Sequence, residues 1–281
     1  MCIRDSFLSY REKFLAGSWR FDTYFGRDTL MSVRLLMPVL QPAAVEGGLS
    51  SVIARLSDGG EVAHEEAIGE FAVLAHIEAD GSRSDAPRYD YAMIDSSYML
   101  APVAAAWLID DARGRARAAA FLAAPSGRVG ATAETTGAAL VRNLRLVLSQ
   151  TRAFAETPVA ANLLAIKPGR NTGQWRDSDT GLGGGRYPFD VNAVFAPAAL
   201  HAVDQLMRAG LLDAYLSPAD LKAFTQAGQM AEIWRAQAPA AFEVTVPVAE
   251  ARAEVSALST RQGVPSAPAL TALGDLSLIH I

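Results

Sequence analysis

Three short segments combine aromatic, acidic and basic side chains in the way that a sugar-binding site requires. Residues 174–178 read Gln-Trp-Arg-Asp-Ser, residues 185–193 read Gly-Arg-Tyr-Pro-Phe-Asp-Val-Asn-Ala, and residues 24–30 read Tyr-Phe-Gly-Arg-Asp-Thr-Leu. Aromatic rings can stack on the apolar faces of sugars, and carboxyl groups can bind hydroxyls or protonate a glycosidic oxygen. The three segments therefore predict a carbohydrate site.

Hydrolysis of a glycosidic bond needs one carboxylic acid to protonate the leaving oxygen and a second carboxylate to activate water or attack carbon. The carboxyl groups that are candidates for these roles are Asp28, Glu65, Glu66, Glu70, Asp95, Asp177, Asp179 and Asp190. Asp177 stands out because Trp175 precedes it by two residues and Arg176 adjoins it. Aspartate also favours turns and helix starts, so Asp28 and Asp190 have a second interpretation as caps of the helices that follow.

The aromatic residues fall into two groups by their surroundings in the sequence. Trp107 and Trp234 lie in apolar helical stretches, which predicts that they belong to the core. Trp19 and Tyr24 lie close to the Gly-Arg-Asp segment that includes Asp28, so they are the better candidates for stacking on a sugar.

Neither a metal site nor a cofactor is predicted. His64 and the two glutamates after it suggest the start of a metalloprotease helix, but the second histidine of that motif would stand at position 68, which is Ile68. The glycine-rich residues 181–185 lack the following Lys-Ser/Thr pair and the preceding strand of a phosphate-binding loop, so we interpret them as a loop beside a ligand.

The composition restricts the class of partner. The 281-residue chain is 51% hydrophobic and 20% charged, with a net charge of −5, as expected of a globular protein with a sizeable core. This acidic balance gives no support to binding of nucleic acid or an anionic membrane. Cys2 is the only cysteine, which excludes a disulfide framework. We expect a carbohydrate partner and a cytoplasmic location, and leave the oligomeric state open.

Both ends of the chain look foreign to the rest of it. Residues 1–6 and residues 276–281 can be encoded by two DNA strings that are reverse complements of each other and resemble a transposon adapter. We therefore leave both ends out of the reasoning about the fold. Residues 7–275 are then one domain and an internal fragment of a longer protein.

Hydrophobic periodicity predicts helices through most of the chain, joined by polar loops rich in glycine. Only residues 242–246 read convincingly as a strand. The strongest helical stretches, by apolar spacing or by their start signals, are residues 42–56, 95–110, 140–148 and 191–210, and the stretch that begins at residue 217. Antiparallel helix pairs joined by alternately short and long loops describe this pattern best.

Taken in order, these segments resemble the glucosidase half of glycogen debranching enzymes (amylo-α-1,6-glucosidases). The resemblance runs from about residue 19 to residue 201 and includes the family's Gly-Arg-Asp-Thr, Asp-Ala and Trp-x-Asp segments and its stretch ending in Asn-Ala. The corresponding residues of this chain are 26–29, 94–96, 174–177 and 185–193, with residues 60–64 in place of a Gly-x-Ile-Pro-Asn stretch. The resemblance implies an all-α fold, a partial (α/α)6 barrel or toroid of antiparallel helix pairs.

The resemblance also implies roles for individual residues. Asp177 would be the general acid, Arg27 and Asp28 would hold hydroxyls of the terminal glucose, and Asp95 and Asp190 would line the same subsite. The other expected substrate-binding residues are Trp19, Tyr24, Glu66, Trp175 and Arg186. The family inverts configuration, which requires about 6.5–9.5 Å between acid and base to accommodate the attacking water.

The chain departs from the family in ways that leave alternatives open. Arg176 replaces Met beside the predicted acid, Asp190 replaces Glu, and the family's Gly-Pro-Glu-Trp segment, which carries the general base, has no counterpart. We expect this base to lie beyond Asp275 and the fragment alone to be inactive. The alternatives are another (α/α)6 carbohydrate-active protein, such as a polysaccharide lyase or sugar epimerase, and an inactive carbohydrate-binding relative.

Overall fold

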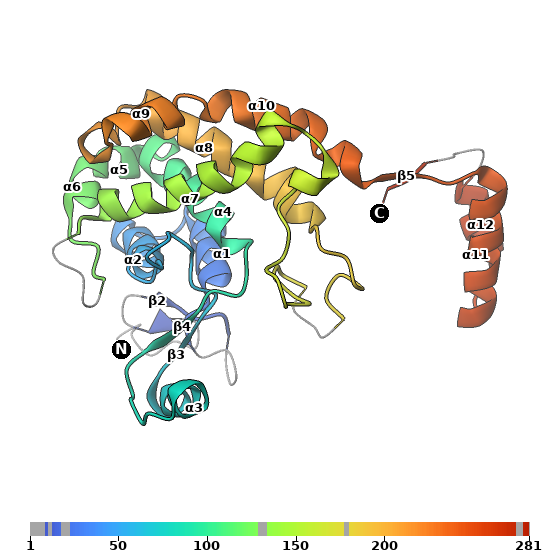
Figure 1. Ribbon diagram of the computed structural model, residues 1–281, viewed down its shortest axis with the longest axis horizontal. Helices are drawn as coiled ribbons and strands as arrows, with labels where there is room; N and C mark the ends of the chain where they lie inside the picture. The colour runs from blue at the N-terminus through green and yellow to red at the C-terminus, as the bar shows by residue number, and fades with distance from the viewer. Residues whose placement is uncertain are drawn as a thin grey trace.

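The computed structural model is mostly helical, with 61% helix and 6% strand (Figure 1), which confirms the expected helical class. It describes residues 9–10, 13–17, 23–128, 134–176, 180–273 and 278–280. The main helices of the body are α1 (Gly26–Leu36), α2 (Pro42–Ile53), α4 (Ser96–Ala105), α7 (Thr136–Glu156), α8 (Ala196–Arg208) and α10 (Ala227–Gln237). None of the helices in the described part is long and apolar enough to cross a membrane.

Shorter elements connect and extend these helices. The helical ones are η3 (Ala106–Asp110), α5 (Ala112–Arg115), α6 (Ala118–Ala123), η4 (Ala160–Asn162), η5 (Asp190–Phe195), η6 (Asp213–Tyr215), α9 (Pro218–Phe224) and η7 (Pro239–Phe242). The antiparallel strand pairs among the described residues are β1 (Ser9–Tyr10) with β2 (Lys13–Phe14), β3 (Glu65–Ala67) with β4 (Arg88–Asp90), and β5 (Glu243–Thr245) with β6 (Leu278–His280). The strand expected at 242–246 is therefore present as β5.

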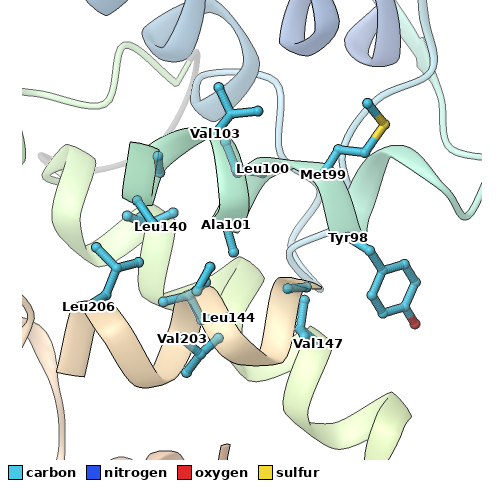
Figure 2. Close-up of a cluster of buried hydrophobic side chains, with 14 of the residues drawn as sticks. Tyr98, Met99, Leu100, Ala101, Val103, Leu140, Leu144, Val147, Val203 and Leu206 are labelled. Atoms are coloured by element: carbon cyan, nitrogen blue, oxygen red, sulfur yellow. The ribbon is translucent and has the colours of Figure 1, made fainter. Parts of the chain in front are cut away.

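Helix α4 lies at the centre of the body, in contact with α1, α7 and α8. Its sequence is rich in small and apolar residues, and all of its residues except Pro102 are buried. Small side chains let neighbouring helices approach closely, and the larger ones between them fill the remaining space. Figure 2 shows Ala101 of α4 pointing toward Leu144 of α7.

Helix α7 forms because its apolar residues recur on one face, while arginine and serine occupy the other. Its first turn is capped by Thr135, whose hydroxyl accepts a hydrogen bond from the backbone N–H of Ala138 at 3.3 Å. Near its end, Phe154 packs on Trp234 of α10 with ring centroids 4.4 Å apart. Both tryptophans predicted to be core, Trp107 and Trp234, are fully buried.

Several helix starts expected from the sequence are confirmed. Pro42 is the first residue of α2, and Ser217 forms a capping box with Asp220 at the start of α9. Two other predicted caps are absent. Helix α1 begins at Gly26, ahead of Asp28, and η5 begins at Asp190 itself, so neither aspartate is the N-cap residue.

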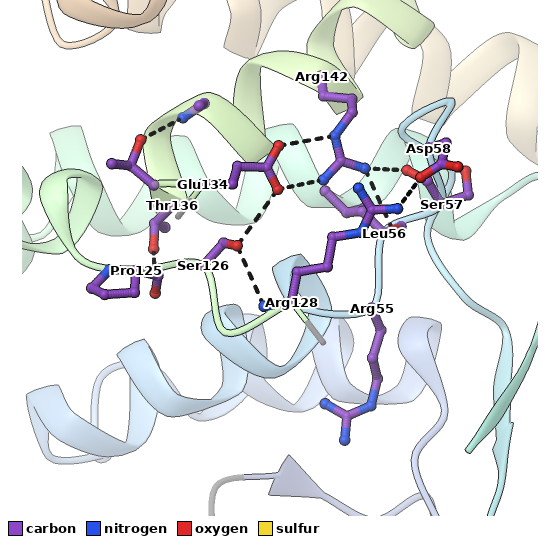
Figure 3. Close-up of polar contacts among 12 residues, drawn as sticks. Arg55, Leu56, Ser57, Asp58, Pro125, Ser126, Arg128, Glu134, Thr136 and Arg142 are labelled. Carbon is purple, nitrogen blue, oxygen red and sulfur yellow. Dashed lines mark hydrogen bonds and ion pairs between the residues drawn. The ribbon is translucent and has the colours of Figure 1, made fainter. Parts of the chain in front are cut away.

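A polar network joins the start of α7 to the turn after α2 (Figure 3). The Arg142 guanidinium donates to both carboxylate oxygens of Glu134, at 3.2 and 2.8 Å, and also to the backbone carbonyl of Ser57. Arg128 pairs with Asp58 on the same turn. The Arg55 side chain points away from this network, toward the end of the body that carries β3 and β4.

Helix α3 (Gly69–Asp80) connects β3 to β4 and was not predicted from the sequence. In α3, Ala72 alone is buried. Helices α11 (Val248–Gln262) and α12 (Ala267–Leu273) lie apart from the body, beyond the extended segment of β5 (Figure 1).

Candidate functional site

The starts of α1, α4 and η5 supply three of the predicted site residues: Arg27, Asp95 and Asp190. Arg27 Nη1 donates to Asp95 Oδ2 at 3.1 Å, and the Asp95 side chain is fully buried. The second carboxylate oxygen of Asp95 accepts the Ser96 backbone N–H at 2.8 Å and its hydroxyl at 3.2 Å. These bonds fix the carboxylate and, through it, the guanidinium beside it.

Gly26 allows α1 to start against the strand-like segment that precedes β3. Its backbone N–H donates to the His64 carbonyl at 2.9 Å. A Cβ atom at this position would lie only 2.2 Å from the Ala63 carbonyl oxygen. Glycine is therefore required here by close approach of two backbones, and this approach sets the position of Arg27, the next residue.

The carboxyl group of Asp190 differs from that of Asp95 in its surroundings. Burial raises the pKa of Asp190, and the nearby charge of Asp95 raises it further, while backbone N–H groups and the charge of Arg176 lower it. Asp190 Oδ2 is buried without a hydrogen-bond partner among the described residues. This side chain is thus the member of the cluster best suited to hold a proton and donate it.

The loop that carries the segment 174–176 lies against the start of α4. The Ile94 backbone N–H donates to the Gly173 carbonyl at 2.7 Å, which places the loop beside Asp95. Trp175 is 53% exposed, and the Arg176 guanidinium carbon lies 4.6 Å from the centroid of its ring. A tryptophan face held open to solvent next to charged groups is a suitable platform for a sugar ring.

Gln174 belongs to the candidate site, although sequence reasoning does not favour it over its neighbours. The side chain is only 1% exposed, yet neither its amide oxygen nor its amide nitrogen has a partner among the described residues. Buried amides normally form hydrogen bonds, so an unsatisfied one beside a candidate site favours a polar ligand that completes them.

Asn192 is a second residue that sequence reasoning did not single out. Its side chain accepts the Leu164 backbone N–H at 2.8 Å and donates to the Leu164 and Pro188 carbonyls at 2.9 and 2.8 Å. It therefore joins the start of η5, and Asp190 with it, to the segment before the glycine-rich loop. Its place in the Asn-Ala segment was visible, but this use of its side chain was not.

Tyr24 does not have the role expected of it. The side chain is fully buried, and the Arg55 guanidinium carbon lies 4.8 Å from the centroid of its ring. A buried ring whose face is covered by a cation cannot stack on a sugar, so the prediction for Tyr24 is corrected to a core position. Burial also raises the pKa of its hydroxyl.

Glu66 forms a buried ion pair with Arg55, whose Nη2 lies 3.1 Å from Oε1 and 3.2 Å from Oε2 of the glutamate. Glu65, the residue before Glu66, forms an isolated β-bridge with Phe25, which directly precedes α1. The Arg55–Glu66 ion pair therefore lies next to the segment that leads into α1. Glu66 therefore supports the wall beside Arg27, and its predicted contact with substrate remains a prediction.

The other predicted residues are placed as follows. Asp28 Oδ2 lies 3.8 Å from Arg27 Nε, at the edge of the cluster. Arg186 donates to the Ile166 carbonyl at 3.2 Å, and its own carbonyl accepts the Ile166 N–H at 2.8 Å, so it anchors the glycine-rich loop. Trp19 and Asp177 lie outside the described residues.

The described residues contain no group of three histidine, cysteine, aspartate or glutamate side chains that could hold a metal ion. No protein-family model matches the chain, and neither a curated protein nor a solved structure matches it. The function must therefore be argued from the site itself.

Proposed function

We propose that this chain is part of an (α/α)6 barrel of a glycoside hydrolase that acts on terminal α-glucosidic linkages, in the manner of debranching enzymes. The observation that carries the proposal is the convergence of Arg27, Asp95 and Asp190, at the starts of three helices, beside the exposed ring of Trp175. Helix starts gathered at one end of a helical body, with loops around them, suit a barrel whose loops form the pocket.

In this proposal the ion pair binds the terminal sugar. Arg27 retains donors beyond the one bonded to Asp95, and a hydroxyl between the two groups can accept from the guanidinium and donate to the carboxylate. The rigid hold on Asp95 by Ser96 keeps that geometry in place before the sugar arrives. Trp175 would stack on an apolar sugar face.

Proton transfer requires a carboxyl group that stays protonated until the leaving oxygen needs it. Asp177 is the proposed general acid, one residue beyond the described loop segment that ends at Arg176. Asp190, with its raised pKa, is a carboxyl group that can share or replace that role. An inverting reaction would need a base about 6.5–9.5 Å from the acid, with the attacking water between them.

The proposal is tested first by binding, which requires no general base. Calorimetric titration with maltose and isomaltose should give saturable binding that Trp175→Ala and Asp95→Asn each weaken. Trp175 is exposed, so its variant should keep the fold and isolate the loss of stacking. Failure of both sugars to bind a folded wild-type chain would remove the proposal.

Because the expected general base has no counterpart in this chain, hydrolysis is tested in a longer protein that includes it. Glucose release from the same sugars is compared for the wild type, Asp177→Asn and Asp190→Asn. If Asp177 is the acid, its substitution should lower the rate by about 10²–10⁴-fold while binding remains. An equal loss with Asp190→Asn alone would transfer the role to Asp190. NMR of the first product anomer distinguishes inversion from retention.

One observation favours a second candidate, a sugar-binding relative without hydrolytic activity. The charge of Arg176 lowers the pKa of Asp190 and adjoins Asp177, which opposes a protonated acid at this place. In that longer protein, sugar binding without glucose release in the wild type, together with glucose release by Arg176→Met, would show that the cation suppresses the chemistry.

A further inference from the structure

A hollow of about 800 Å³ lies between helix α3 and the β3–β4 hairpin. Its size is toward the upper end of the range of about 300–1,000 Å³ found for small-molecule sites, so it can hold more than one hexose ring. The walls come from the hairpin strands, the residue Thr23, and one face of α3.

The face of α3 that borders the hollow has apolar side chains that nothing in the described structure covers. Phe71 is 67% exposed and Leu74 is 61% exposed, although both face the hairpin across the hollow. Two hydrogen bonds hold α3 in this position: Arg88 Nη1 donates to the Ala75 carbonyl at 3.1 Å, and His76 Nε2 lies 3.1 Å from the Ala86 carbonyl oxygen. These two hydrogen bonds connect α3 to the segment of β4 along one side of the hollow.

The polar groups around the hollow are mainly acceptors. Glu65, Glu70 and Glu78 line it and have no ion-pair partner among the described residues. Arg88 is the only cation among the described residues that line it. On the hairpin side, Tyr89 is half-buried and lies opposite Glu66 in the strand register. Aromatic surface beside carboxylates that accept hydroxyl donors is the combination that suits a sugar chain.

The hollow is joined to the candidate site by a shared wall. Thr23 Oγ1 donates to the Glu66 carbonyl at 2.9 Å, and the Glu66 N–H donates to the Tyr24 carbonyl at 3.2 Å. The same chain segment then passes through the Phe25–Glu65 bridge into Arg27 at the start of α1. The segment that borders the hollow therefore leads directly to Arg27, the residue proposed to bind the terminal sugar.

We propose that the hollow between α3 and the β3–β4 hairpin binds the further sugar units of a neutral gluco-oligosaccharide whose terminal unit occupies the site at Arg27 and Asp95. The inference rests on the proposed function and adds to it the length and the charge of the oligosaccharide that binds. Phe71 and Tyr89 provide the apolar contacts, and Glu65, Glu70 and Glu78 accept hydroxyl hydrogen bonds. Acidic polysaccharides are excluded, because unpaired carboxylates on the walls repel uronate groups.

The test is calorimetric titration of the intact chain with maltose, maltotetraose and maltoheptaose. We expect the dissociation constant to fall as the chain lengthens beyond maltose. Phe71→Ala should weaken heptaose binding by roughly 3- to 10-fold, since one aromatic contact contributes about 0.5–1.5 kcal/mol, and should leave maltose binding unchanged. Leu258→Ala, at a similarly exposed apolar position on the remote α11, is the matched control and should change neither.

The outcomes separate this inference from the proposed function. Equal affinity for maltose and heptaose would overturn the hollow as a sugar site while leaving the terminal site in place. Heptaose binding that depends on Phe71 but not on Asp95 would support the hollow and count against the proposed function. Binding of an oligogalacturonate as tight as that of the neutral chain, or tighter binding of a glucosamine oligomer, would overturn the assignment to a neutral sugar.

Discussion

The helical body around α4, α7, α8 and α10 buries aliphatic and aromatic side chains, whereas the end with β3, β4 and α3 buries charged groups and leaves apolar ones exposed. Trp234 represents the first region, fully buried against Phe154. The pair Arg55–Glu66 represents the second, together with the exposed ring of Phe71. A core is built to exclude water, while an inverted arrangement of this kind is typical of a surface built to receive a ligand.

The largest effect is expected from Trp234→Ala in the body. It removes a fully buried ring and the hydrogen bond from Nε1 to the Thr151 carbonyl at 3.0 Å. The free energy of unfolding should fall toward the upper end of about 3–5 kcal/mol, as for large-to-small changes in a core. Urea denaturation followed by circular dichroism measures it, and a loss below about 1 kcal/mol would show that this region is not the stabilising core.

Arg55→Ala, at the end of the molecule that carries β3 and β4, should lower the free energy of unfolding by a comparable amount. Glu66 would stay buried and lose its ion pair with Arg55, and breaking a buried ion pair costs about 3–5 kcal/mol. The double variant Arg55→Leu with Glu66→Leu should recover most of this loss, because both charges are then gone. Equal instability of the single and double variants would mean that the lost packing, including the contact with Tyr24, matters more than the charge.

A smaller, pH-dependent effect is expected from Asp190→Asn. The folded protein binds a proton on Asp190 more tightly than the unfolded chain does, so this group's contribution to stability falls as pH rises from the ordinary aspartate pKa through the raised one. Asparagine does not titrate, so the variant should gain stability relative to wild type across that window. Urea midpoints from pH 3 to pH 8 test this, and a pH-independent difference would contradict a raised pKa.

The smallest effect on stability is expected from Phe71→Ser on α3. The ring is exposed, so the free energy of unfolding should change by no more than about 0.5 kcal/mol. The same change in a buried ring such as Phe154 should be severely destabilising. A large loss for Phe71→Ser would show that α3 packs against something in solution and would weaken the contrast between the two regions.

The body could be predicted from the sequence because it follows local rules. The apolar spacing of α2 and α7, the proline at the start of α2 and the capping box of α9 each depend on residues within a few positions of one another. Trp107 and Trp234 were assigned to the core on the same basis. The closure of helix pairs into a barrel stays a prediction, because apolar spacing does not specify how the pairs meet.

The site was predictable in its residue types but not in its contacts. Arg27, Asp95 and Asp190 were chosen from segments far apart in the sequence, and the 3.1 Å bond from Arg27 to Asp95 joins residues separated by 68 positions. The sequence neighbours of Tyr24 resemble a sugar site, whereas its ring is fully buried in the core and contacts Arg55, which is 31 positions away. Helix α3 has no single apolar face, so its pattern did not identify it.

The extended segment at β5 determines how the chain should respond to a protease. All three β5 residues are exposed, and extended backbone enters a protease cleft directly, whereas helical backbone must first unwind. Limited digestion should therefore cut first near residues 243–247 and separate α11 and α12 from an intact helical body. A shortened chain that ends at Phe242 is accordingly the best starting point for crystals of the candidate site.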